Sequence, residues 1–124
     1  MALLYTDSLD MLTGTAPAEA SVGVTGTTTG VTCDVSKRRQ ISVAFRSANG
    51  TGTYSIDGSN DGGSWVTSIA CTDTQGTALS TGTTSVIVAS TIKAVYVPPG
   101  FRYIRAVVAV PAGGTHFAYL HDAG

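Results

Sequence analysis

The stretch Tyr54-Ser-Ile-Asp-Gly-Ser-Asn-Asp-Gly-Gly-Ser-Trp65 decides the fold expected for this chain. Its first and third residues are apolar and alternate with Ser and Asp, the period-two pattern of a strand with one buried face. Residues 58–63 then bring together Gly, Ser, Asn and Asp, which tolerate positive φ or bond their own backbone, so the chain should reverse there. We therefore predict a β-hairpin whose return strand starts with Trp65, Val66 and Ile69.

Composition favours the same class for the whole chain. Its 124 residues suit a single domain. Charged residues make up 12%, about half of the roughly 25% in an average soluble domain. Thr, Ser and Gly take their place, and the β-branched Thr suits a pleated surface better than a helical one. An all-β domain is expected.

The same alternation, interrupted by turn residues, recurs along the chain. It predicts an edge strand at 16–25 and further strands at 31–35, 41–46, 85–89, 94–97, 101–110 and 115–121. Residues 26–30 read as a turn, Asn49-Gly50 as a hairpin turn, and residues 72–82 as a long loop. Eight or nine short strands predict a two-sheet antiparallel β-sandwich, jelly-roll-like, with no helix longer than one turn.

Residues 1–15 are atypical, because apolar side chains crowd a segment broken by Asp and Ser. We treat residues 1–15 as an N-terminal arm and residues 16–124 as the single β-sandwich domain. The arm is either a first strand or tail folded over the core, or a segment that docks on a neighbouring subunit. Its candidate contact residues are Leu3, Leu4, Tyr5, Leu9, Met11 and Leu12.

Several classes of protein are disfavoured. A net charge of −1 provides no global field for nucleic acid or anionic lipid. No run approaches the roughly 20 apolar residues of a membrane span, and the N-terminus lacks the pattern of a secretory signal. Cys33 and Cys71 are expected as buried free thiols, with a disulfide as the less favoured alternative.

The sequence gives little support for a catalytic site or a metal site. His116 and His121 are the two histidines, and on one strand their odd separation places them on opposite faces, so they cannot chelate a metal together. No nucleophile motif or phosphate-binding loop accompanies them. We expect no enzyme, no cofactor and no metal. The basic run Lys37, Arg38 and Arg39 is either a solvated loop or a contact with an acidic neighbour.

The turn after Tyr54 allows two sharper interpretations. Its acidic residues are spaced like the start of a calcium loop, but the twelfth position is Ser68 rather than Glu, which favours a plain turn. Trp65, with Asn60 and Asp61, could stack on a sugar; a core tryptophan is the favoured interpretation.

Three pieces together carry a family resemblance. They are the segment from Ile41 through Gly-Ser-Asn-Asp-Gly-Gly-Ser-Trp-Val66, the segment Val95-Tyr-Val-Pro-Pro-Gly-Phe-Arg-Tyr-Ile-Arg-Ala106, and a short glycine turn followed by a last strand. In this order they resemble β-sandwich virion proteins of tailed bacteriophages, most closely head decoration (capsid cement) proteins. The resemblance covers roughly residues 40–121.

The resemblance implies a protein that binds the outside of an assembled phage head and stabilises contacts between major capsid subunits. It implies a homotrimer, made in the host cytoplasm and located on the virion surface. The arm and the run Lys37 to Arg39 are the predicted contacts. The alternative is a glycan- or receptor-binding virion module, in a fibre, tail or neck, that uses Asn60, Asp61 and Trp65.

Overall fold

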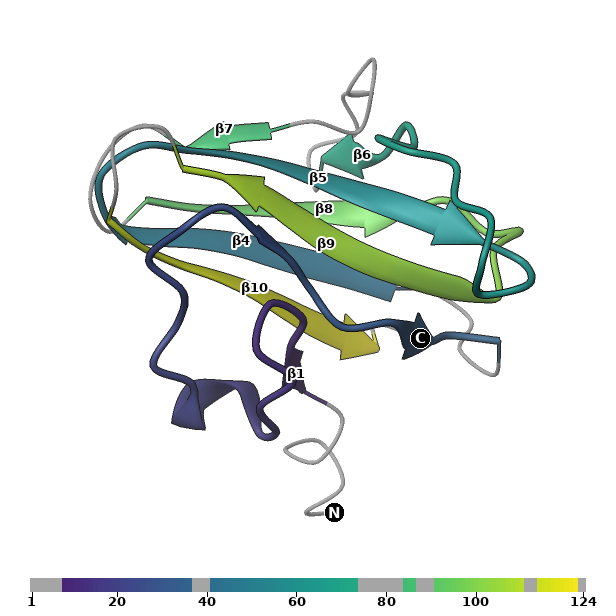
Figure 1. Ribbon diagram of the computed structural model, residues 1–124, viewed down its shortest axis with the longest axis horizontal. Helices are drawn as coiled ribbons and strands as arrows, with labels where there is room; N and C mark the ends of the chain where they lie inside the picture. The colour runs from purple at the N-terminus through teal and green to yellow at the C-terminus, as the bar shows by residue number, and fades with distance from the viewer. Residues whose placement is uncertain (1–7, 37–40, 74–83, 87–90, 111–113, 123–124) are drawn as a thin grey trace.

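The computed structural model describes residues 8–36, 41–73, 84–86, 91–110 and 114–122, and arranges them as two antiparallel sheets (Figure 1). The described part holds ten strands and one short 3-10 helix, Ala18–Ala20. The strands are β1 (Leu9–Asp10), β2 (Thr28–Thr29), β3 (Cys33–Asp34), β4 (Ile41–Asn49), β5 (Gly52–Ser59), β6 (Thr72–Asp73), β7 (Thr84–Val86), β8 (Thr91–Val97), β9 (Tyr103–Ala109) and β10 (Thr115–Asp122).

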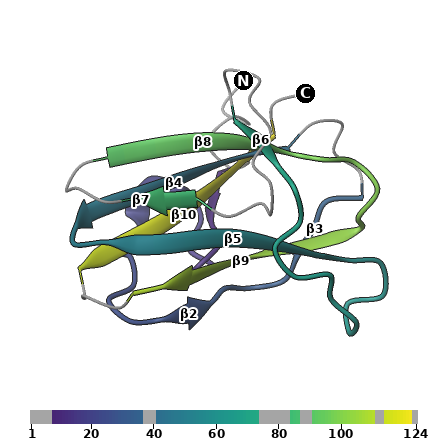
Figure 2. The same cartoon turned by 90° about the horizontal axis from the view of Figure 1, so that it is seen from above.

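The order of the strands is that of a jelly roll. One sheet runs β1-β10-β4-β8-β6 and the other β2-β9-β5-β7, with β3 also paired to β9. Figure 2 shows β2, β9, β5 and β7 side by side in that order. Without the two-residue strands β3 and β6, each sheet has four strands, and the chain crosses between the sheets from β4 to β5 and from β9 to β10. The predicted all-β, two-sheet sandwich is confirmed.

The core lies between the sheets and follows the predicted alternation. In β9, Ile104, Ala106 and Val108 are fully buried, whereas the residues between them face outward and are half-buried. In β4, Val43 and Phe45 are fully buried in the same way. The period of two along each strand therefore places one face in the core.

The hairpin predicted at Trp65 is wrong, because the main pairing partner of β5 is another strand. Strand β5 pairs with β9 along seven residues and with β7 on its other side. The segment after the tip meets β5 through the Gly58–Val66 bridge, one bond from the Ile69 N–H to the Ile56 carbonyl oxygen, and one from the Ser68 N–H to the Asp57 carboxylate. It has little apolar alternation, whereas β9 offers a long strand with a complete apolar face. The stronger pairing therefore goes to β9.

Asn49-Gly50 does not form a hairpin either. It joins β4 of one sheet to β5 of the other, so it is a corner of the sandwich. Gly50 has a φ of +80°, a backbone conformation that favours glycine. This conformation agrees with the turn that we predicted at Asn49-Gly50. The turn signal is correct, but turn residues alone do not say whether the next strand returns to the same sheet.

The segment from 16 to 30 differs from its prediction. Residues 18–20 form the 3-10 helix, and the N–H of Ala18 binds the Ser8 hydroxyl at 3.1 Å. The predicted turn contains β2, in which Thr28 and Thr29 pair with β9. Two β-branched threonines beside an open strand edge pair with it in spite of the flanking glycines.

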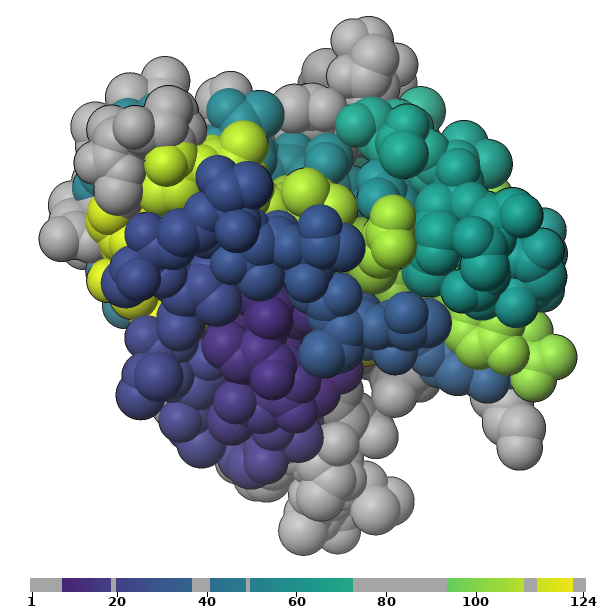
Figure 3. Space-filling view, viewed as in Figure 1, coloured from purple at the N-terminus to yellow at the C-terminus, as the bar shows by residue number. Residues whose placement is uncertain are grey.

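The N-terminal segment folds back onto the sandwich. Figure 3 shows its purple part enclosed by the blue segment that follows it. β1 pairs with β10, Met11 is fully buried, and Leu12 is 5% exposed. The fully buried carboxylate of Asp10 accepts bonds from the N–H groups of Leu12 and Ala118 and from the Ser21 hydroxyl. Because these hydrogen bonds satisfy the buried carboxylate, Asp10 fastens the N-terminal segment to β10.

A second buried polar group ties the two sheets together. The Tyr54 hydroxyl, from β5, donates to the Arg46 carbonyl oxygen of β4 at 2.9 Å and lies 2.6 Å from Nδ1 of His116 in β10. Because the hydroxyl has a single proton, Nδ1 of His116 carries the donor hydrogen for the second bond. Burial, and then the charge of Asp10, raise the pKa of Tyr54 far above its usual value.

The two cysteines are buried free thiols, as the sequence predicts. Burial raises the pKa of the Cys71 thiol to about 11, so it stays protonated and unreactive at neutral pH. Among the described residues, no helix has the length and apolar character to cross a membrane.

We predict that Tyr54→Phe lowers the free energy of unfolding by about 1–3 kcal/mol, because it removes a buried hydroxyl that bonds the Arg46 carbonyl oxygen and the His116 ring. Urea unfolding followed by tryptophan fluorescence measures the change. Tyr103→Phe is the matched control, since it removes a hydroxyl from a half-buried outer-face tyrosine, and it should change stability by less than about 0.5 kcal/mol. Equal effects of the two variants would contradict a special role for the Tyr54 hydroxyl.

Candidate functional site

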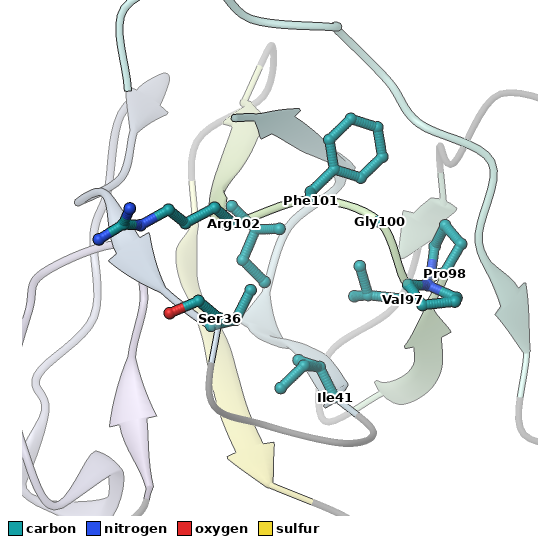
Figure 4. A pocket seen from close by; sticks show the side chains of 10 residues that line it. Ser36, Ile41, Val97, Pro98, Gly100, Phe101 and Arg102 are labelled. Atoms are coloured by element: carbon teal, nitrogen blue, oxygen red, sulfur yellow. The ribbon is translucent and has the colours of Figure 1, made fainter. Parts of the chain in front are cut away.

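A pocket of about 320 Å³ opens at one end of the sandwich (Figure 4). The loop from β8 to β9 forms one wall, and the residues around the end of β3 and the start of β4 form the other. The lining residues are Val35, Ser36, Ile41, Val97, Pro98, Pro99, Gly100, Phe101, Arg102 and Ile104. Its volume lies at the lower limit of ligand pockets, which start at about 300 Å³.

The pocket has an apolar interior and a polar rim. Val35, Ile41, Val97 and Ile104 belong to the hydrophobic core that continues beneath it. Figure 4 shows the Ile41 and Val97 side chains turned toward the space, whereas the Arg102 side chain reaches outward at the rim. An apolar group is therefore favoured inside and a charged one outside.

Arg102 is only loosely held. Its guanidinium lies 3.7 Å from the Asp34 carboxylate, and the two side chains are 56% and 49% exposed. It also lies over the Tyr103 ring, 5.1 Å from the centroid. Such an exposed pair contributes little to stability, so this cation can take another partner at small cost.

Two of the three stretches that carry the family resemblance meet beside this pocket. The Phe101 ring packs on Gly58, where an added Cβ would come within 2.6 Å of the ring. The Asn60 side-chain oxygen accepts the Arg102 backbone N–H at 3.0 Å. The tip after β5 thus supports the loop that forms the pocket wall, and Gly58 is required for that close approach.

The tip itself is a closed turn, as the sequence favours. The Asp61 carboxylate accepts the N–H groups of Gly63 and Ser64, each at 2.8 Å, and the Ser59 hydroxyl at 3.1 Å. These bonds lower the pKa of Asp61 to about 2. Within the described residues, no group of three His, Cys, Asp or Glu side chains could hold a metal ion.

Trp65 is not a core residue, which corrects the favoured prediction. It is half-buried on the outer face of β9, where the Arg105 guanidinium lies 4.2 Å from its ring centroid. Arg105 also forms a 3.0 Å ion pair with Asp57, whose side chain is 5% exposed. The cation covers a face of the indole because it is already fixed by the buried carboxylate. The stacking on this face of the indole is a cation–π interaction with Arg105, so a sugar would have to stack on the opposite face of the ring.

The predicted arm contacts divide into two groups. Met11 and Leu12 lie in the core, and Leu9 packs against it, so for these three residues the fold-back alternative holds. The contact with a neighbouring subunit that we predicted for Met11 and Leu12 is not open to buried side chains. Leu3, Leu4 and Tyr5 lie outside the described residues.

The basic run also lies outside the described residues. Lys37, Arg38 and Arg39 nevertheless belong to a four-residue connection between Ser36 and Ile41, both of which line the pocket. The predicted contact run therefore stays a prediction, and its described neighbours in sequence belong to the pocket lining.

The histidines are separated as their spacing predicts. His116 is fully buried beside Tyr54, whereas His121 is exposed. Sequence reasoning missed two features of the structure. It used Pro98-Pro99-Gly100 as the end of a strand and as part of the family resemblance, without predicting a pocket wall, and it gave no role to Asp10. An acidic residue inside an otherwise apolar segment is the signal that could have identified Asp10 as an internal anchor.

Comparison of the chain with models of protein families and with curated proteins finds no match. Among solved structures, the crystal structure of SPBc2 prophage-derived protein YomS is similar, with a TM-score of 0.63 and 10% sequence identity. The similarity covers 92% of this chain and 89% of that chain. At this identity the likeness shows a shared fold over nearly the whole of both molecules.

We predict that Arg105→Met lowers the free energy of unfolding by about 1–3 kcal/mol, because it leaves the buried Asp57 carboxylate without its cation. Chemical denaturation of this variant, of Asp57→Asn and of the double variant gives the coupling energy. Arg102→Met is the matched control and should change stability by less than about 1 kcal/mol, since its ion pair is exposed. Additive effects of the Asp57 and Arg105 substitutions would contradict the coupling.

We also predict that Asp61 titrates near pH 2 in the folded chain, below its usual value of about 3.9. A lowered folded pKa means that the carboxylate stabilises the fold above pH 4, and that this contribution is lost as pH falls toward 2. Carboxyl-carbon NMR measures the titration. Ser59→Ala removes one donor and should raise the Asp61 pKa part of the way; a normal pKa in the unmodified chain would contradict the closed turn.

Proposed function

We propose that the chain is a structural protein of a tailed-phage virion, and specifically a decoration protein on the outer surface of the head. Two observations support the proposal. The jelly roll resembles a prophage-derived protein over nearly the full length of both chains. Two of the three stretches that carry the sequence resemblance to decoration proteins also pack against each other through Gly58 and Phe101.

The physical character of the molecule suits such a role. Core packing and the Tyr54 bonds fasten the two sheets together, and the Asp10 carboxylate fastens the N-terminal segment to β10, which gives a rigid block with fixed surfaces. A surface with few charges is a solubility liability for a free monomer and is better suited to a chain packed against neighbours. A cement protein needs this rigidity and a contact surface, and no chemistry.

In this proposal, the pocket end faces a major capsid subunit. Arg102 is exposed there, and Lys37, Arg38 and Arg39 are joined in sequence to the pocket lining. Leu3, Leu4 and Tyr5 remain predicted contacts of the arm. The proposal includes a homotrimer on the capsid surface and no direct contact with nucleic acid or membrane.

Purified particles of the phage that encodes the chain provide the test. We expect mass spectrometry to find the chain in intact virions, and gold-labelled antibody to mark regular positions on the head. Heads assembled without the chain should bind the purified protein and then resist heating better than undecorated heads.

The control is a tail preparation from the same phage. Labelling confined to tails or necks would overturn the decoration role and leave a virion protein with another location. Absence of the chain from purified particles would overturn the virion role itself.

A further inference from the structure

We infer that the outer face of the sheet β2-β9-β5-β7 binds a neutral saccharide, held by the Arg105 guanidinium, the Trp65 ring and the hydroxyl groups beside them. The inference goes beyond the proposed function, because holding a capsid together requires no sugar. Of the three residues predicted for a glycan, Asn60 and Asp61 are engaged by bonds in the tip and the pocket wall. Trp65 is therefore the one that this site retains.

The first argument is that Arg105 presents hydrogen-bond donors in a fixed position. Its Nε donates to the Asp57 carboxylate at 3.0 Å, and within the described part of the chain its Nη1 and Nη2 have no partner. The side chain is 26% exposed. The ion pair and the Trp65 ring, 4.2 Å away, already hold the planar group in place. A ligand that accepts bonds from Nη1 and Nη2 therefore costs little conformational entropy.

The second argument is the presence of free hydroxyl groups on both sides of β9. Val107 is the next residue after Arg105 on the outer face, and it pairs with Ser55 of β5 and with Thr29 of β2. Ser55 is half-buried and Thr29 is exposed, and neither hydroxyl has a hydrogen-bond partner among the described residues. In Figure 3 the light green of the β9 region is visible between the blue segment that carries β2 and the teal segment that follows β5. These hydroxyls can both donate and accept, as every sugar hydroxyl does.

The third argument is the balance of charge on this face. Arg105 pairs with Asp57, and Arg102 pairs with Asp34. An anionic ligand would meet repulsion as well as attraction there, whereas a neutral hydroxyl needs only the hydrogen-bond geometry. The half-buried Trp65 ring has one face covered by Arg105, and its opposite face can attract the C–H groups of a sugar ring, because the π system is negative on its faces. A neutral saccharide satisfies all of these groups together.

Fluorescence titration of the full chain tests the inference, because Trp65 is its single tryptophan and lies in the proposed site. The probes are three neutral oligosaccharides: cellohexaose, maltohexaose and mannohexaose. We expect a saturable change in Trp65 emission with at least one of them, together with amide NMR shifts at Ser55, Thr29 and Arg105. Hexagalacturonate, which is anionic, should bind no more tightly. Absence of a saturable change with all three neutral probes, or tighter binding of the anionic one, would overturn the inference.

Three substitutions each remove one proposed contact. Arg105→Lys keeps a cation for Asp57 and removes the planar guanidinium. Ser55→Ala and Thr29→Val remove hydroxyls that bond nothing in the described part of the chain, so these two variants should keep the stability of the unmodified protein. Each of the three should weaken binding about threefold or more, the effect of one lost hydrogen bond. Unchanged binding in both hydroxyl variants would count against the site even where Arg105→Lys binds poorly.

Matched controls lie on the outer face of the other sheet. There the Arg46 guanidinium lies 4.8 Å from the Phe117 ring centroid, and Ser42 is half-buried on the same strand. Arg46→Lys and Ser42→Ala make the same chemical changes as two of the test variants and should leave binding unchanged. Equal losses in controls and test variants would overturn the inference.

Two other results would show a different occupant or a different place, and each overturns the inference. Amide shifts at Ser55 and Thr29 that depend on protein concentration without sugar would show a second copy of the chain on this face. Saccharide-induced shifts confined to Ala44 and Tyr96 would place the sugar on the other sheet, where these two residues lie on neighbouring strands.

Discussion

The pairing of β5 with β9 is the constraint on which the rest of the structure depends. Each strand has one apolar face, and their pairing side by side in one sheet turns both faces into the core. The register places Asp57 opposite Arg105 and Gly58 opposite Ile104. From that register follow the ion pair on the outer face, the cation over Trp65, and the contact of Phe101 with Gly58. The pocket wall is therefore a consequence of strand pairing.

Two buried polar groups make the arrangement specific. Packing of apolar faces alone tolerates sliding, because hydrophobic contact has little direction. The Asp10 carboxylate and the Tyr54 hydroxyl do not tolerate it, since each is buried and satisfied only in one geometry. Asp10 holds the N-terminal segment on β10, and Tyr54 holds β5 against β4 and β10. A chain with so few charged residues uses an ionic group inside, where an unpaired charge would be costly.

Local pattern predicted the strands and not their partners. Alternation of apolar residues located β4, β8, β9 and β10 and the buried face of β9, because that pattern directly reflects burial on one side. Asn49-Gly50 located a turn but not the change of sheet, which depends on where distant strands lie. Trp65 was assigned to the core because its own side chain is apolar, whereas its position is set by Arg105, forty residues later in the sequence. The pocket is built from segments before β4 and after β8, so no single stretch of sequence contains it.

The character of the pocket end bears on how such a protein would be held at its site. A net charge of −1 provides little overall attraction to a partner, and the exposed Arg102–Asp34 pair is screened by salt. Retention in the proposed complex therefore requires a contact that excludes water. The apolar lining, with residues such as Ile41 and Val97, offers a surface for such a contact, and the bonds that fix the pocket wall limit the conformational entropy that binding would cost.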